Sequence, residues 1–186
     1  MAEVKKSASY GEWTIEVLDS NQIVVKKNGE ICEKAKPELR AIAESLNYEY
    51  DPEWDTQQLG KNVADIIEMK EKQSLKIDGR MKVNQLKRNF KCVYNATLRV
   101  YDGKKRADDN ATLSELRAEG CKGGDMTCTP EDTVEYFEFF LQNLYGIHVE
   151  VATIDDWVLV LDLMPLGRIK EIGKNATKAK MEEMLK

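Results

Sequence analysis

Two segments of the sequence decide its fold: VNQLKRNFKCVYNATLRVY, residues 83–101, and VEYFEFFLQNLYGIHVEVA, residues 134–152. In each, the apolar spacing of an amphipathic helix passes directly into the alternating pattern of a strand, and a polar turn follows. A shift of 51 residues superimposes the segments and pairs apolar residues at seven positions. Two amphipathic helices can share a period by chance, but the same order of helix, strand and turn in both segments indicates an internal duplication. The apolar pairs are Val83 and Val134, Leu86 and Phe137, Phe90 and Leu141, Val93 and Leu144, Tyr94 and Tyr145, Leu98 and Val149, and Val100 and Val151.

Each copy is predicted to contain a helix, a strand, a turn, a second strand and a short helix, over residues 80–120 in copy 1 and 130–186 in copy 2. Copy 2 is expected to end with a further polar helix that begins near Asn175. Because two strands alone form no stable sheet, the copies are expected to combine into one small sheet of about four strands, covered on one face by the longer helices. Residues 118–130 contain three glycines and are expected to be a flexible connection.

A hairpin is predicted near the N-terminus. Residues 13–19 alternate apolar and polar side chains, and a second apolar run, residues 22–25, follows a short polar turn. Asn28-Gly29 favours another tight turn, which would bring Ile31 back as a short third strand.

Two helices are predicted after this hairpin. Helical spacing begins at Pro37, and Asp55 with Gln58 three residues later has the pattern that caps a second, longer helix. Residues 71–80 are polar with an Asp-Gly turn signal and are expected to be a linker. The predicted fold class is therefore α+β, with a ββαα module over residues 1–72 followed by the duplicated unit.

The charges of the two copies are opposite. Residues 80–107 contain nine Lys and Arg residues and one Asp, a net charge of +8, whereas residues 130–162 contain eight Asp and Glu residues and no Lys or Arg, a net charge of −8. The net charge of the whole chain, −5, conceals this difference. One interpretation is two solvated surfaces, and the other is attraction between the copies, within one chain or between chains.

The basic copy is the candidate surface for an anionic partner. A stripe of Lys and Arg with Tyr94 and Tyr101 nearby could contact the phosphates of a nucleic acid and stack on its bases. The acidic copy opposes this interpretation, because it would repel the same polymer. The predicted basic interaction residues are Lys87, Arg88, Lys91, Arg99, Lys104, Lys105 and Arg106.

The helix of the acidic copy is apolar on nearly every side. Tyr136, Phe139 and Phe140 add to the core positions, so one face is expected to pack on its own hairpin and the other against the rest of the chain or against another protein. These three aromatic residues are the predicted apolar interaction site.

No motif for catalysis is recognisable. The single histidine, His148, has no second histidine for a metal site, no glycine-rich phosphate loop is present, and the four cysteines show no C-x-x-C spacing. We therefore predict no catalytic residues, no metal and no cofactor. The absence of a signal sequence and of a long apolar run predicts a cytoplasmic protein without membrane contact.

Residues 48–60, YEYDPEWDTQQLG, and 97–117, TLRVYDGKKRADDNATLSELR, resemble short modules found in uncharacterised proteins of gut bacteria. Those modules also occur as repeats. The resemblance covers about half the chain and implies reuse of the units in different combinations, but it transfers no catalytic motif. The expected function is non-enzymatic binding of a protein partner or of another copy of the chain, and the alternative is nucleic-acid binding by the basic stripe.

Overall fold

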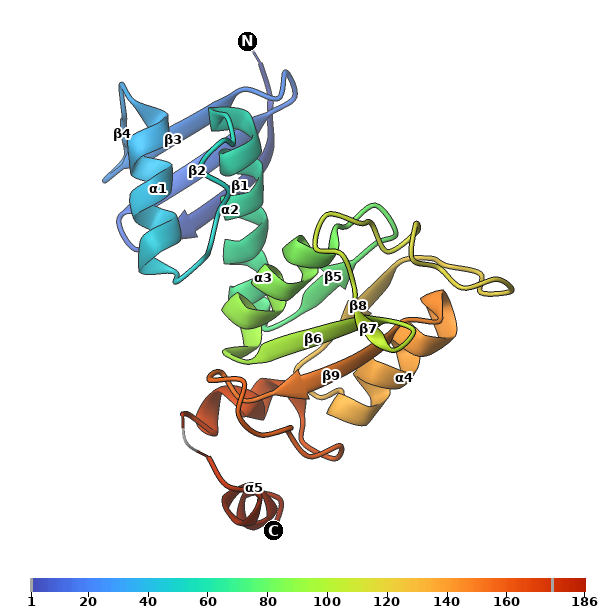
Figure 1. The fold of residues 1–186 in the computed structure, drawn as a ribbon. Helices are drawn as coiled ribbons and strands as arrows, with labels where there is room; N and C mark the ends of the chain where they lie inside the picture. Colours follow the sequence, from blue (N-terminus) through green and yellow to red (C-terminus); the bar gives the residue numbers. More distant parts are fainter. Residues whose placement is uncertain (1, 175) are drawn as a thin grey trace. The chain divides into compact units, whose positions relative to one another are not determined.

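The computed structural model describes residues 2–174 and 176–186, and it divides into two compact units, one ending at Glu71 and the other beginning at Lys72. The fold class is α+β, as predicted, and all paired strands are antiparallel (Figure 1). Among the described residues, no helix combines the length and the apolar character needed to cross a bilayer.

The N-terminal unit contains a four-stranded sheet in the order β1-β2-β3-β4. The strands are β1 (Val4–Tyr10), β2 (Trp13–Leu18), β3 (Ile23–Lys27) and β4 (Glu30–Ile31). The predicted hairpin corresponds to β2 and β3, and the short strand after Asn28-Gly29 is β4. The ββαα prediction omits β1, because only Ala8 of that strand is buried and its sequence therefore lacks apolar alternation.

Two helices complete this unit, α1 (Ala35–Ser45) and α2 (Thr56–Lys72). The predicted cap of α2 forms as a reciprocal pair: the Gln58 backbone N–H donates to Asp55 Oδ1 at 2.8 Å, and the Asp55 N–H donates to Gln58 Oε1 at 3.0 Å. The core side chains come from β2, β3 and both helices: Ile15, Val17, Ile23, Val25, Leu39, Ile42, Leu59, Val63 and Ile66.

The second unit repeats one order of elements with a spacing of 51 residues. Strands β5 (Leu75–Ile77) and β8 (Met126–Cys128), helices α3 (Val83–Tyr94) and α4 (Val134–Tyr145), and strands β6 (Thr97–Asp102) and β9 (His148–Ala152) all begin at equivalent positions. Strand β7 (Lys105–Arg106), the 3-10 helix η1 (Leu166–Glu171) and helix α5 (Lys178–Met184) complete the unit.

The strands of the two copies pair with each other. Strand β6 pairs with β9 around the central pair Arg99 and Glu150, and β5 pairs with β8 around Lys76 and Thr127. The residues of each central pair are 51 positions apart, so each copy presents equivalent positions to the other, as in a two-fold dimer. The internal duplication stays a prediction, which these equivalent positions support.

The copies form two sheets and not the expected single four-stranded one. One sheet has the order β7-β6-β9 and the other pairs β5 with β8. Helices α3 and α4 lie side by side with the strands of this unit (Figure 1). The rings of Phe90 and Phe137, one from each copy, are 5.1 Å apart between centroids and fully buried, so the copies share one core.

Three other sequence-based expectations differ from the structure. The predicted linker, residues 71–80, includes the boundary between the two units but also contains β5, and the predicted flexible connection, residues 118–130, contains β8. Each of these strands has only three residues, so neither is recognisable without its partner. In place of the short helix of copy 1, residues 113–115 form a turn. Asn175, the predicted start of the last helix, lies outside the described residues, and α5 is capped by Thr177, whose hydroxyl accepts from the Lys180 N–H at 3.3 Å.

Candidate functional site

The predicted basic residues lie on α3, on β6, and in the hairpin formed by β6 and β7. Lys87, Arg88 and Lys91 lie on α3, and the exposed Lys104, Lys105 and Arg106 lie in and after the turn between β6 and β7. Lys87 Nζ is 2.6 Å from Asp109 Oδ1, and Arg88 Nε donates to the Asn84 carbonyl at 3.3 Å. Two of these basic side chains therefore already have interaction partners within copy 1.

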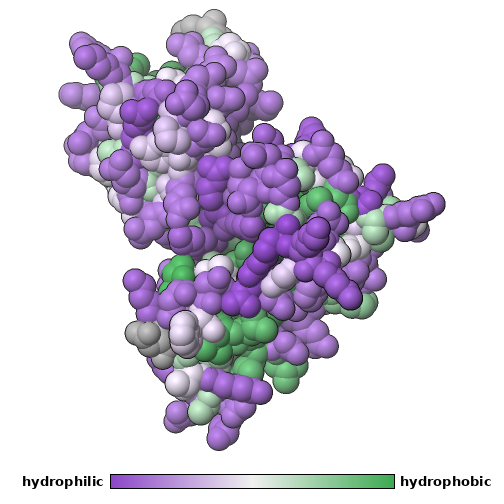
Figure 2. Space-filling view, viewed as in Figure 1, coloured by the Kyte–Doolittle hydropathy of each residue, from purple (hydrophilic) through white to green (hydrophobic). Residues whose placement is uncertain are grey.

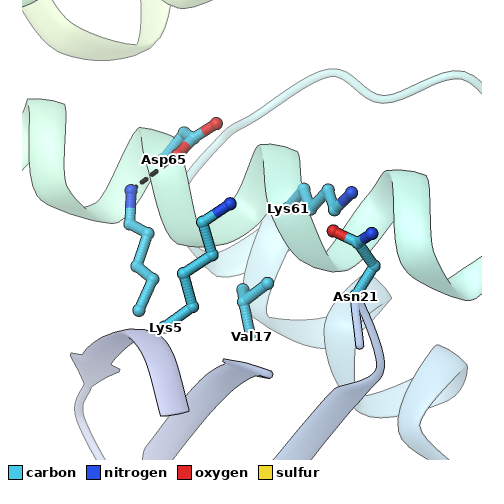
Figure 3. Close-up of a pocket in the computed structure, with 6 residues that line it drawn as sticks. Lys5, Val17, Asn21, Lys61 and Asp65 are labelled. Atoms are coloured by element: carbon cyan, nitrogen blue, oxygen red, sulfur yellow. Dashed lines mark hydrogen bonds and ion pairs between the residues drawn. The ribbon is translucent and has the colours of Figure 1, made fainter. Parts of the chain in front are cut away.

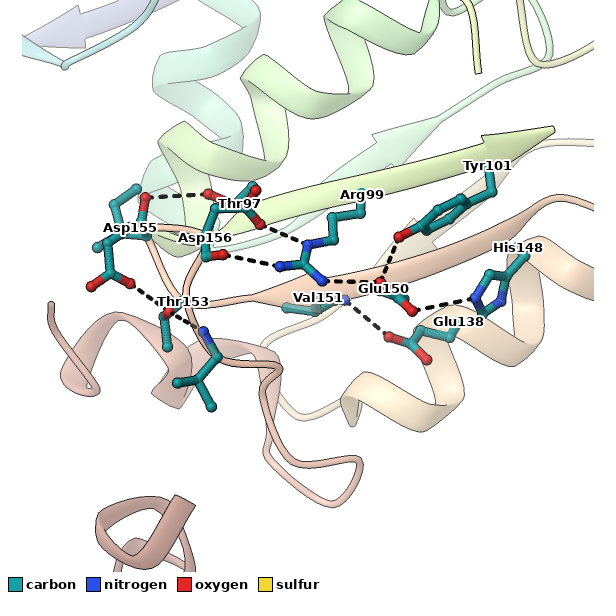
Figure 4. Close-up of polar contacts among 12 residues, drawn as sticks. Thr97, Arg99, Tyr101, Glu138, His148, Glu150, Val151, Thr153, Asp155 and Asp156 are labelled. Atoms are coloured by element: carbon teal, nitrogen blue, oxygen red, sulfur yellow. Dashed lines mark hydrogen bonds and ion pairs between the residues drawn. The ribbon is translucent and has the colours of Figure 1, made fainter. Parts of the chain in front are cut away.

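Arg99 connects the two copies instead of facing a partner. Its guanidinium lies 3.2 Å from Glu150 Oε2 and 2.7 Å from Asp156 Oδ1, and it also donates to the Asp156 carbonyl at 2.9 Å (Figure 4). The hydrogen bond to Asp156 raises the pKa of Arg99, although partial burial opposes it. This side chain offsets acidic charge of copy 2 and is not available to bind a phosphate.

Neither tyrosine of the nucleic-acid hypothesis offers a free ring face. Tyr94 is 1% exposed, and burial raises the pKa of its hydroxyl well above the usual range. Tyr101 donates to Glu150 Oε2 at 2.8 Å, while the Arg106 guanidinium lies 4.6 Å from its ring centroid and the His148 ring 5.2 Å from it (Figure 4). Base stacking on either ring would require rearrangement.

Large exposed apolar side chains are concentrated in the acidic copy. Phe139 is 62% exposed, Tyr136 46% and Trp157 83%, whereas Phe140 is half-buried. Within the described part of the second unit, nothing covers Tyr136 and Phe139 of this helix. Figure 2 shows hydrophobic surface over the part of the chain that follows β9. We give the name apolar surface of copy 2 to the exposed apolar residues of α4 and of the segment between β9 and η1, taken together: Tyr136, Phe139, Trp157, Leu159 and Leu163.

Three exposed apolar residues of copy 2 lie at positions that carry basic residues in copy 1. Phe139 of α4 corresponds to Arg88 of α3, 51 residues earlier. The turn that follows β9 in copy 2 is two residues longer than the turn that follows β6 in copy 1. Tyr101 pairs with Arg106 in copy 1, and the equivalent residue of copy 2, Ala152, pairs with Leu159. Trp157 and Leu159 therefore replace two of the basic residues of copy 1, Lys104 and Arg106. At these three positions copy 1 carries a cation and copy 2 an apolar group.

An acidic hollow of about 260 Å³ lies beside Phe139. It is lined by one side of α4 together with His148 and Asp162. Glu138 accepts from the Val151 backbone N–H at 3.0 Å, and burial raises the pKa of this carboxyl, with the nearby Asp162 adding to the effect. The lining residues are Glu135, Glu138, Phe139, Gln142, His148 and Asp162.

Sequence reasoning missed Trp157, Leu159 and Leu163. Trp157 directly follows Asp155-Asp156, a dipeptide typical of a polar turn. Only the structure shows that Trp157 belongs to this turn and that its indole is exposed. Leu159 and Leu163 alternate with buried Val160 and Met164, so they resemble core residues in the sequence.

Within the described residues, no three His, Cys, Asp or Glu side chains are grouped closely enough to hold a metal ion. His148 is exposed on β9, and its Nε2 lies 3.8 Å from Glu150 Oε1. Comparisons with protein-family models, curated proteins and solved structures find no match for this chain.

Proposed function

We propose that this chain is a non-enzymatic binding protein that engages a protein partner through the apolar surface of copy 2. The observation that carries the proposal is the 83% exposure of Trp157, together with the exposed Phe139 of the same copy. Exposed aromatic groups of this size are typical of contact sites, because they bury a large area on association.

The charge around this surface indicates the chemistry of the partner. The carboxylates of Glu135, Glu138 and Asp162 line the hollow beside Phe139, and residues 130–162 contain no Lys or Arg. A complementary partner would present apolar side chains flanked by Lys or Arg. The basic copy of a second chain has part of this chemistry, so self-association belongs to the same proposal.

Site-specific photo-cross-linking in the source cell tests the proposal. A benzophenone amino acid placed at Phe139 or Trp157 should form covalent adducts of one defined mass, whereas the same group at Ile31 should not. Ile31 is the matched control, because it is 71% exposed but lies in the other unit. Adducts equally abundant at all three positions, or absent at all three, would contradict the proposal.

The affinity for the captured partner, or for a second copy, gives the quantitative test. Truncation of a central tryptophan typically costs about 2–4 kcal/mol of binding free energy, which raises Kd ~30- to 700-fold. Trp157→Ala should have this effect in calorimetry while leaving the thermal unfolding temperature unchanged, since the indole is exposed. Ile31→Ala should change neither quantity.

Nucleic-acid binding is the second candidate, and the exposed Lys104, Lys105 and Arg106 favour it. If they contact phosphates, affinity should fall steeply with salt, because each neutralised phosphate releases counterions. Replacing the three with glutamate should abolish binding to single-stranded DNA and RNA. No measurable binding by the unmodified chain at low salt would eliminate this candidate.

A further inference from the structure

A second candidate site lies in the N-terminal unit and includes none of the residues proposed above for binding. A hollow of about 410 Å³ is lined by Lys5 and Lys6 of β1, Val17 of β2, Asn21 of the following turn, and Lys61 and Asp65 of α2 (Figure 3). This volume is within the range of sites for small molecules, about 300–1,000 Å³, and exceeds what a bare inorganic ion requires.

A β-bulge aims two consecutive lysines at this hollow. Side chains of a regular strand alternate between its faces, so Lys5 and Lys6 would normally point in opposite directions. The pairing of β1 with β2 shifts register here, from Val4 opposite Leu18 to Lys6 opposite Val17. The bulge re-aims the chain, and both lysines line the hollow.

Only one of the three lysines is neutralised. Lys6 Nζ lies 2.5 Å from Asp65 Oδ1 and 2.8 Å from Glu68 Oε2. It therefore forms an ion pair with Asp65, which is the one carboxylate among the described residues that line the hollow. Lys5 and Lys61 form no ion pair within the described residues. Figure 3 shows their ammonium groups in the space between the strands and α2, with the Asn21 amide beside Lys61.

The backbone of the turn holds Asn21 in this position. Asn21 has a left-handed conformation with φ of 63°, and its N–H donates to the Leu18 carbonyl at 2.9 Å. Its side chain therefore adds an amide donor to the two ammonium groups, while Val17 supplies an apolar wall.

We propose that this hollow binds a small soluble phosphomonoester. Two unpaired ammonium groups from different elements match a dianion whose charge is spread over three oxygens, whereas a planar carboxylate is better matched by the fork of an arginine. The volume beyond the phosphate, next to Val17 and the lysine methylenes, accommodates the organic part of the ligand.

Titration of the full chain with ribose 5-phosphate, followed by ¹H–¹⁵N NMR, tests this site. The amide signals of Asn21 and Lys61 should shift and saturate. Ribose without phosphate, and sodium chloride of equal ionic strength, should produce no saturable shift. The double variant Lys5→Gln/Lys61→Gln should bind at least ~10-fold more weakly, because it loses two charge-assisted contacts.

The matched control is Lys34→Gln/Lys36→Gln, which removes the same charge elsewhere in this unit and should retain the unmodified affinity. Both variants should unfold at the temperature of the unmodified chain, since none of the four lysines has an ion-pair partner in the described residues. Equal weakening by the two variants, a response to chloride as large as that to ribose 5-phosphate, or binding only to vesicles of phosphatidic acid would overturn the proposal.

Discussion

Replacing Phe137 with alanine tests whether the two copies share one core. Phe137 is fully buried on α4 of copy 2, and its ring lies against that of Phe90 on α3 of copy 1. Truncating a buried phenylalanine costs about 3–5 kcal/mol, because the transfer free energy is lost and a cavity remains. Since this cavity would lie between the copies, both should lose stability together.

Native-state hydrogen exchange of the full chain measures the effect separately in each copy. A loss of ~3 kcal/mol speeds exchange through global opening by about 150-fold. We expect this acceleration for the protected amides of β6 in copy 1 and equally for those of α4 and β9 in copy 2. The control is Phe139→Ala, the same substitution two residues later at an exposed position, which should change the opening free energy by less than about 0.5 kcal/mol.

Faster hydrogen exchange in copy 2 alone would refute this reasoning. If Phe137→Ala speeds exchange in α4 and β9 but leaves β6 unchanged, the copies open independently and the contact with Phe90 does not couple them. If Phe139→Ala accelerated exchange as much as Phe137→Ala, the Phe139 side chain would contribute to packing in spite of its exposure in the structure.

Three other changes have definite expected outcomes. Arg99→Gln removes the ion pairs between the copies and should lower the unfolding free energy by about 1 kcal/mol at low salt and less at high salt, measured by urea denaturation. Burial raises the folded-state pKa of Glu138 above its ordinary value of 4.5, so its ionisation costs stability as the pH rises past that value. Glu138→Gln, which keeps the acceptor for the Val151 N–H, should therefore raise the unfolding temperature at pH 7 but not at pH 4, and an equal increase at both would contradict this assignment. Gly146→Ala should destabilise by at least ~1 kcal/mol in thermal unfolding, because φ is 70° and the added Cβ would overlap the Ala118 side chain, whereas Gly103→Ala, at a similar φ with open space around it, should cost less.

The sequence predicts those elements whose signal is contained within themselves. Helices α3 and α4 and strands β6 and β9 were recognisable because each carries its own apolar period, and their spacing of 51 residues was visible without any structure. The cap of α2 was equally local, since Asp55 and Gln58 satisfy each other's backbone groups.

Tertiary structure alone decided strands β1, β5 and β8. Strand β1 is polar, and β5 and β8 have three residues each, so these strands exist only because a partner strand satisfies their backbone groups. The prediction of one four-stranded sheet failed for this reason: the short strands before α3 and α4 pair with each other and form a separate sheet.

The candidate sites divide in the same way. Sequence composition was enough to show that one copy is basic and the other acidic, and to identify Tyr136 and Phe139 as more apolar surface than one helix face needs. It could not show that Arg99 is neutralised by Glu150 and Asp156, or that the Trp157 indole is left exposed. The physical reason is that charge and hydrophobicity belong to a residue, whereas ion pairing and burial depend on which distant segments the fold places around it.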